Sequence, residues 1–64
     1  MLKTLREKAG LKSYEAAVKL GVHPMTISRW ENGHSAPTVD QLSKIREVYN
    51  LTDSEVLALL KEAS

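Results

Sequence analysis

Residues 13–33, SYEAAVKLGVHPMTISRWENG, predict two short helices joined by a tight turn, and the side chains at their junction restrict how the helices cross. Ala17 is small enough for the second helix to pass closely, and Gly21 can adopt the positive φ that a sharp turn requires. Val22 and Ile27 then fill the angle between the helices. A turn of about three or four residues holds such a corner at about 90 to 120°. We therefore expect the chain to fold around a helical corner.

Apolar spacing and turn residues define three helices in the first half of the chain. A first helix is expected to end at Gly10, and a second to run from about residue 13 to residue 20. Pro24 suits the first turn of a third helix, where its missing N–H is no loss, and Asn32-Gly33 ends that helix. The expected inward residues are Leu2, Leu5 and Ala9, then Ala16, Ala17 and Leu20, then Ile27 and Trp30.

Two capping boxes define the helices of the second half. Thr38 is followed three residues later by Gln41, and Thr52 is followed in the same way by Glu55. Apolar residues at helical spacing follow each box, namely Val39, Leu42, Ile45 and Val48, then Val56, Leu57, Leu59 and Leu60. Only residues 34–37 resemble an extended connection, and no segment alternates with period two. The predicted fold class is all-α, a compact bundle of five short helices.

The size and composition of the chain predict one cytoplasmic domain, residues 1–64. A core this small is marginal without very regular helices or a partner, and the absence of cysteine excludes disulfides and thiolate zinc sites. No apolar run approaches the ~20 residues of a membrane span, and the N-terminus lacks the apolar stretch of a signal peptide.

The uneven charge of the chain indicates a partner. Residues 1–34 carry six Lys and Arg against three Glu, a balance of +3, whereas residues 35–64 carry three basic against five acidic residues, a balance of −2. The half with the helical corner is therefore the basic one, although an ordinary solvated surface can also show so small an excess. A helix-turn-helix corner places its second helix in the DNA major groove. We therefore predict a DNA-binding domain with its helix-turn-helix core at 13–33 and double-stranded DNA as partner.

On the third helix, Arg29 is the strongest candidate for reading bases, because a guanidinium can donate two hydrogen bonds to guanine O6 and N7. Met25 offers an apolar contact to a thymine methyl, and Pro24 has neither a donor nor a charge. Ser28 fits either a groove contact or an ordinary solvated position.

Helical spacing also suggests a charge pair between the first and third helices. Arg6 follows Leu2 by four residues and Glu31 follows Ile27 by four, so each charge lies beside the apolar stripe of its own helix. If the stripes face one another, the charges meet, and a partly buried pair would fix how the first helix sits on the third. The spacing alone leaves this pairing open.

Several side chains have simple structural explanations. Trp30 is expected in the core, His23 is expected to begin the third helix, and His34 is expected in a loop, so no metal site is predicted. Tyr14 and Tyr49 are each expected to cover apolar surface. No catalytic carboxylate pair and no nucleophile in a known motif is present, so we predict neither an enzyme nor a cofactor.

The last helix suggests a homodimer. Leu57 and Leu59 lie about 200° apart at ~100° per residue, so a small core can hardly bury both. One of them is expected to face a second copy, which would place two recognition helices about one DNA turn, roughly 34 Å, apart on a palindromic operator. The alternative is a single exposed leucine, which proteins tolerate.

Short motifs in a fixed order cover nearly the whole chain: LREKAGL at 5–11, AxxLGV at 17–22, TISRWENG at 26–33, Pro37-Thr38-Val39 and Leu51-Thr52. In this order and spacing the chain resembles the Cro/repressor-type (lambda repressor-like, XRE-type) helix-turn-helix domains of phage and bacterial transcription regulators. The resemblance implies that Arg6 pairs with Glu31 and that DNA is bound by two sets of residues. The base-reading set is Pro24, Met25, Ser28 and Arg29, and the phosphate-contacting set is Ser13, Lys12, Tyr14, Thr26, Asn32, His34 and Ser35. Ser13 is shorter than the family's glutamine, so we expect it to cap the second helix and leave Lys12 or Tyr14 to reach the phosphate.

Together these patterns predict a sequence-specific regulator of transcription, a phage or bacterial repressor or Cro-like protein that occupies an operator and excludes polymerase. The alternative is a protein-interaction module, an antitoxin or antirepressor that binds a partner protein. The apolar Pro24-Met25 tip and the low net charge of +1 favour this alternative.

Overall fold

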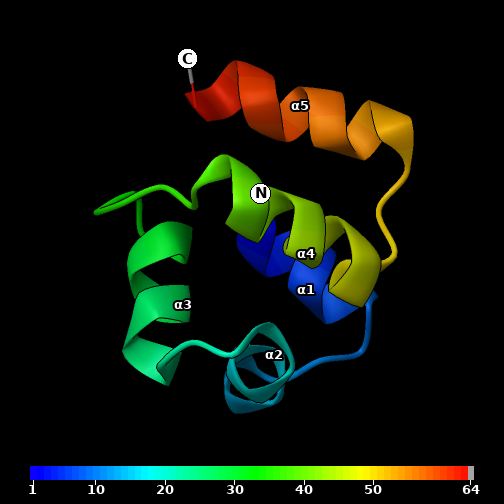
Figure 1. Ribbon diagram of the computed structural model, residues 1–64. Helices are drawn as coiled ribbons and strands as arrows, with labels where there is room; N and C mark the ends of the chain where they lie inside the picture. The colour runs from blue at the N-terminus through cyan, green and yellow to red at the C-terminus, as the bar shows by residue number, and fades with distance from the viewer. Residues whose placement is uncertain (64) are drawn as a thin grey trace.

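The computed structural model describes residues 1–63 (Figure 1). These residues form five α-helices and no strand: α1 (Leu2–Lys8), α2 (Ser13–Leu20), α3 (Pro24–Glu31), α4 (Val39–Tyr49) and α5 (Asp53–Ala63). The prediction of an all-α bundle of five short helices is confirmed. Within the described residues, no helix combines the length and the apolar character needed to cross a membrane.

The helices enclose one core and leave α3 at the edge of the molecule. α2 packs against α3 and α4, α1 packs against α3, and α5 lies on the side of the molecule opposite α2 (Figure 1). The buried apolar residues are Leu5, Ala16, Ala17, Leu20, Ile27, Trp30, Ile45, Tyr49, Leu51 and Leu59. The core position predicted for Trp30 is confirmed. Of the two tyrosines, Tyr49 covers apolar surface as predicted, whereas Tyr14 is exposed.

Both predicted capping boxes are present. The Thr38 N–H donates to Gln41 Oε1 at 2.8 Å, and the Gln41 N–H donates back to Thr38 Oγ1 at 3.2 Å. At the start of α5 the Thr52 N–H donates to Glu55 Oε1 at 2.9 Å, and the Glu55 N–H donates to Thr52 Oγ1 at 3.2 Å. Each box satisfies two backbone donors that a helix start would otherwise leave unpaired.

The inner stripe predicted for α4 is wrong at its first residue. Ile45 is fully buried, but Val39 is 82% exposed. At ~100° per residue, six residues carry Val39 about 120° around the helix from Ile45, so constant steps of three leave the buried face. Tyr49, four residues after Ile45, takes the inner position at the other end of the helix.

The structure divides the two leucines that were predicted to face opposite sides of α5. Leu59 is 8% exposed and belongs to the core, whereas Leu57 is 58% exposed. Leu59 is therefore wrong as a candidate dimer contact, and Leu57 is left as the candidate.

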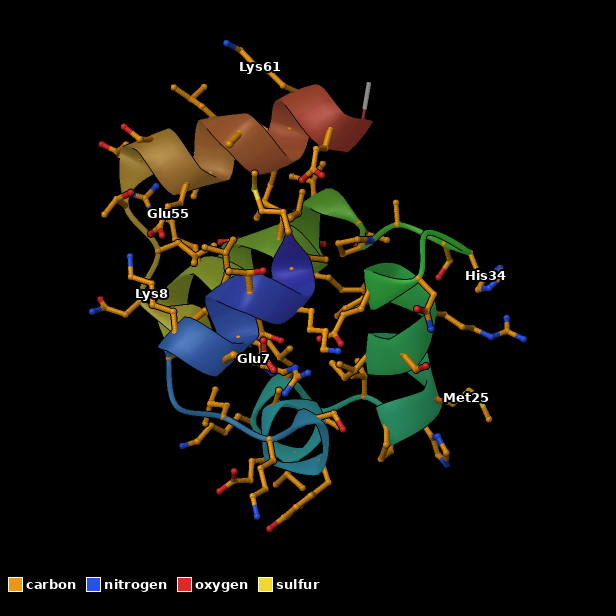
Figure 2. The ribbon with its side chains drawn as sticks, turned by 180° about the vertical axis from the view of Figure 1, so that it is seen from behind. Glu7, Lys8, Met25, His34, Glu55 and Lys61 are labelled. Carbon is orange, nitrogen blue, oxygen red and sulfur yellow. The ribbon has the colours of Figure 1, made fainter. Side chains whose placement is uncertain are left out.

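An ion pair joins the start of α5 to α1. Glu55 Oε2 accepts a hydrogen bond from Lys8 Nζ at 3.1 Å (Figure 2).

Candidate nucleic-acid interface

The corner between α2 and α3 has the predicted construction. Ala17 and Ile27 are buried where the two helices meet, and Val22 packs partly buried against the core. Gly21 has φ 70° and ψ 31°, which is the left-handed conformation. Its N–H donates to the Val18 carbonyl at 3.2 Å, and the Val22 N–H donates to the Ala17 carbonyl at 3.0 Å. These two bonds form a Schellman motif, which ends α2 and turns the chain towards α3.

The start of α3 uses an unexpected cap. His23 is the N-cap residue, so it lies at the start of this helix as predicted. Its Nδ1 accepts a hydrogen bond from the Met25 N–H at 3.0 Å. Pro24 follows as the first helical residue, where it loses no hydrogen bond. The histidine thus serves as a cap, and within residues 1–63 no group of three or more His, Asp or Glu side chains is placed to hold a metal ion.

The outer face of α3 is open to solvent. Ile27 and Trp30 fix the inner face in the core, so the residues between them point outward. The four predicted base-reading residues are all exposed, namely Pro24, Met25, Ser28 and Arg29, whereas Thr26 is half-buried. In Figure 2 the side chain of Met25 projects away from the body of the molecule, and so does that of His34 in the loop after α3. Among residues 1–63, no neighbouring segment covers this face.

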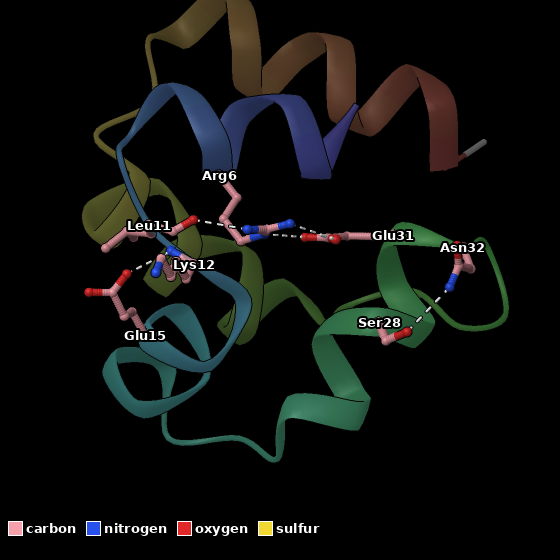
Figure 3. Close-up of polar contacts among 7 residues, drawn as sticks. All are labelled: Arg6, Leu11, Lys12, Glu15, Ser28, Glu31 and Asn32. Carbon is pink, nitrogen blue, oxygen red and sulfur yellow. Dashed lines mark hydrogen bonds and ion pairs between the residues drawn. The ribbon is translucent and has the colours of Figure 1, made fainter.

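An ion pair fastens α1 to the end of α3 (Figure 3). Arg6 Nε donates to Glu31 Oε2 at 2.7 Å and Arg6 Nη2 donates to Glu31 Oε1 at 3.2 Å, while Nη1 donates to the Leu11 carbonyl at 2.9 Å. The two side chains are only 9% and 10% exposed. The predicted pair is therefore confirmed, and its two parallel bonds fix a direction as well as a distance.

The electrostatics of this pair follow from its contacts. The hydrogen bonds to Glu31 raise the pKa of Arg6 above its ordinary value, against the opposing effect of burial. Tyr49 lies in the core beside the pair, and its pKa is raised mainly by burial and next by the negative charge of Glu31. Because both pKa values are raised, Arg6 stays charged and Tyr49 stays neutral across the physiological pH range.

A second contact lies on the outer face of α3. Asn32 Nδ2 donates to Ser28 Oγ at 3.3 Å (Figure 3). Sequence reasoning placed Ser28 among the base-reading residues and Asn32 among the phosphate contacts, so it missed that the two side chains touch. Their spacing of four residues on a helix was the signal that could have found the contact.

The start of α2 differs from the prediction at one residue. The N-cap residue is Lys12, whose N–H donates to Glu15 Oε1 at 2.8 Å (Figure 3). Ser13 is the first residue of the helix and makes no capping hydrogen bond, so its predicted role as the cap is wrong. The Glu15 carboxylate already accepts the hydrogen bond from the Lys12 N–H at the cap position. Lys12, Ser13 and Tyr14 are all exposed.

Two exposed stretches therefore flank the outer face of α3. One is the start of α2, and the other follows α3 and contains Asn32, His34 and Ser35, all exposed.

Sequence reasoning missed Lys44 of α4, whose Nζ lies 3.8 Å from the point that a Cβ on Gly21 would occupy. A cation at this place faces the carboxyl end of α2, where the helix dipole is negative. Lys44 therefore places a positive charge beside the turn between α2 and α3.

Five helices, a buried corner and an uncovered third helix define an all-α helix-turn-helix protein. The family model described as Helix-turn-helix matches residues 2–56, and the chain belongs to this family. The resemblance inferred from the motifs is confirmed.

One curated relative is the HTH-type transcriptional regulator ImmR of Bacillus subtilis (strain 168), with 36% identity over 56 residues. The match covers 88% of this chain and 44% of the relative, so the chain spans less than half the length of that protein. No solved structure gave a significant match.

Proposed function

We propose that this protein binds double-stranded DNA sequence-specifically through the outer face of α3 and regulates transcription at an operator. The observation that carries the proposal is that α3 is held by a buried corner on one side and is open to solvent on the other. A helix of about 10–12 Å diameter fits a major groove about 12 Å wide. The similarity to a transcriptional regulator supports the same activity.

The exposed side chains suggest how DNA is bound. Arg29 reads guanine, since this residue is exposed and its guanidinium has no hydrogen-bond partner among the described residues. The start of α2 contacts one phosphate stretch through Lys12, Ser13 or Tyr14, where backbone N–H groups and the helix dipole add attraction. The residues after α3 contact the other. Thr26, half-buried, lies between these two stretches and is the weakest of the proposed phosphate contacts.

The protein is proposed to act as a homodimer on a palindromic operator. Leu57 is 58% exposed, and Leu60, three residues on, is 46% exposed, so α5 carries an apolar strip for a second copy. A two-fold axis at α5 would present two copies of α3 to successive turns of the major groove. Occupying an operator in this way blocks polymerase, in the cytoplasm of a bacterial or phage-infected cell.

The proposed alternative, a module that binds a partner protein, is favoured by one observation. Met25 is 60% exposed at the tip of α3, where a polar group would be the more usual reader of bases. The family match and the relative do not add support to this alternative.

The decisive experiment is selection of bound duplexes from a random pool, followed by binding measurements over a range of salt concentrations. Arg29→Ala should relax base preference at one position. Lys12→Ala should weaken all sequences alike and reduce the salt slope by about 1. Lys61→Ala is the matched control, because this cation lies on α5 and points away from α3 (Figure 2). No enrichment of any duplex, together with capture of a protein partner, would favour the alternative.

A further inference from the structure

The outer face of α3 carries a stripe of three exposed side chains, Met25, Ser28 and Asn32. They are spaced by three and then four residues, so they are neighbours along one face of the helix. Met25 presents an apolar surface at one end (Figure 2). At the other end Asn32 Nδ2 donates to Ser28 Oγ (Figure 3). An apolar group therefore stands beside a hydroxyl whose partner is fixed.

The contact with Asn32 decides what the Ser28 hydroxyl can offer to a ligand. A serine hydroxyl has one hydrogen to donate and lone pairs that accept, so a free serine contacts base donors and base acceptors alike. Here the Asn32 amide occupies one lone pair of Ser28 Oγ, and the hydroxyl hydrogen must point away from that amide. Among the hydrogen bonds within residues 1–63, the hydroxyl donates to no other group, so its hydrogen is available to the outside. The contact with Asn32 therefore favours Ser28 as a donor towards the groove.

An apolar group next to a donor matches one base edge in the major groove. Thymine presents the O4 acceptor beside its C5 methyl, whereas guanine has acceptors without a methyl, and adenine and cytosine present amino donors. Resting on the proposed DNA binding by α3, we propose that Met25 and Ser28 together recognise thymine. Asn32 is the positioning residue that holds the Ser28 hydroxyl as a donor.

A single substitution reverses the polarity of this contact. The carboxylate introduced by Asn32→Asp can only accept, so the Ser28 hydroxyl must donate to it and then faces the groove as an acceptor. The backbone tolerates the change, because Asn32 has φ −94° and lies outside the left-handed region. The matched probe is 5-methylcytosine, which has the same methyl as thymine and an N4 amino donor in place of the O4 acceptor.

The experiment measures binding at fixed salt to one duplex selected from the random pool and to two derivatives changed at a single base pair, in which thymine·adenine becomes deoxyuracil·adenine or 5-methylcytosine·guanine. Replacing thymine by deoxyuracil removes the methyl and should weaken wild-type binding about fourfold. Replacing it by 5-methylcytosine should weaken binding about fivefold, the value of one hydrogen bond. With Asn32→Asp the ratio of affinities for thymine and 5-methylcytosine should invert, while overall affinity falls because of the added negative charge.

Three further variants separate positioning from a general effect. Ser28→Ala should bring the ratio close to one, and adding Asn32→Asp to it should then leave the ratio unchanged. Asn32→Ala, which adds no charge, should lower the ratio towards one because the hydroxyl can rotate. Ser54→Ala, at an exposed position of α5 away from the outer face of α3, is the control and should leave the ratio as in the wild type. Circular dichroism checks that each variant keeps its helices.

The outcomes distinguish this inference from the function on which it rests. Selected duplexes without a preferred thymine, or a ratio that does not respond to Asn32, would overturn the inference and leave DNA binding intact. Failure to enrich any duplex would refute DNA binding and the thymine contact together.

Discussion

The stability of the domain should depend on the single carboxylate that pairs with Arg6. Glu31→Ala removes both oxygens that accept from the guanidinium, and Arg6 then keeps only its hydrogen bond to the Leu11 carbonyl among the described residues. Because both side chains are about nine-tenths buried, the cost is that of an uncompensated buried charge, about 3–5 kcal/mol. A chain of 64 residues has a total stability of about 3–10 kcal/mol. The variant should therefore lose at least about a third of its stability, and all of it if the total lies at the low end of this range.

Urea unfolding followed by the fluorescence of Trp30, the one tryptophan of the chain, measures this loss. At a slope of about 1 kcal/mol per molar urea, the midpoint should fall by about 3–5 M, or the variant should be unfolded in water. The control is Glu47→Ala, which removes an exposed glutamate from α4. The double variant Arg6→Met/Glu31→Leu removes both charges and should recover most of the stability. The reasoning is refuted if Glu31→Ala costs no more than the control, or if the double variant is as unstable as Glu31→Ala.

Three other substitutions test separate parts of the structure. Gly21→Ala should cost about 1–2 kcal/mol in thermal unfolding from backbone strain at φ 70°, since a Cβ there meets only ordinary contacts; an unchanged midpoint would contradict this. The pKa of Glu55 is lowered from 4.5 by its hydrogen bond from the Thr52 backbone and then by Lys8. Its contacts therefore stabilise the fold above pH 4.5, and this stabilisation is lost as pH falls through the lowered pKa. Glu55→Gln should remove this part of the pH dependence of urea unfolding, and an unaltered profile would count against it. Leu57→Lys should abolish two-to-one binding to a palindromic duplex in sedimentation and leave monomer unfolding unchanged, whereas a persisting dimer would place the contact elsewhere.

Local rules predicted most of the fold because its helix ends follow them closely. Thr38 and Thr52 mark helix starts by their own side chains, and Gly21 marks an end by the conformation it alone adopts without strain. The error at Val39 has a different origin. The prediction followed apolar residues at every third position. Three residues turn a helix by only ~300°, so a long series of such steps moves off the buried face.

The candidate site was predictable in outline and not in its contacts. Burying Ile27 and Trp30 turns the opposite side of α3 outward, and the four base-reading candidates lie on this exposed side as predicted. Spacing can show that two exposed side chains, such as Ser28 and Asn32, lie within reach of one another, but their rotamers decide whether they bond. The His23 cap and the bond between Asn32 and Ser28 are of this kind.

The last turn of α3 connects stability with recognition. Glu31 and Asn32 are consecutive, and at ~100° per residue they point in different directions, one to the buried Arg6 and the other to Ser28 on the exposed face. Because the bond to Arg6 has two parallel contacts, it fixes the rotation of α3 about its own axis and hence the direction of the outer stripe. An apolar pair at positions 6 and 31 restores the stability of the buried contact, but it does not fix the rotation of α3 about its axis. The stable double variant Arg6→Met/Glu31→Leu should therefore discriminate between bases less well than the wild type. This result would separate the contribution of the ion pair to stability from its contribution to the orientation of α3.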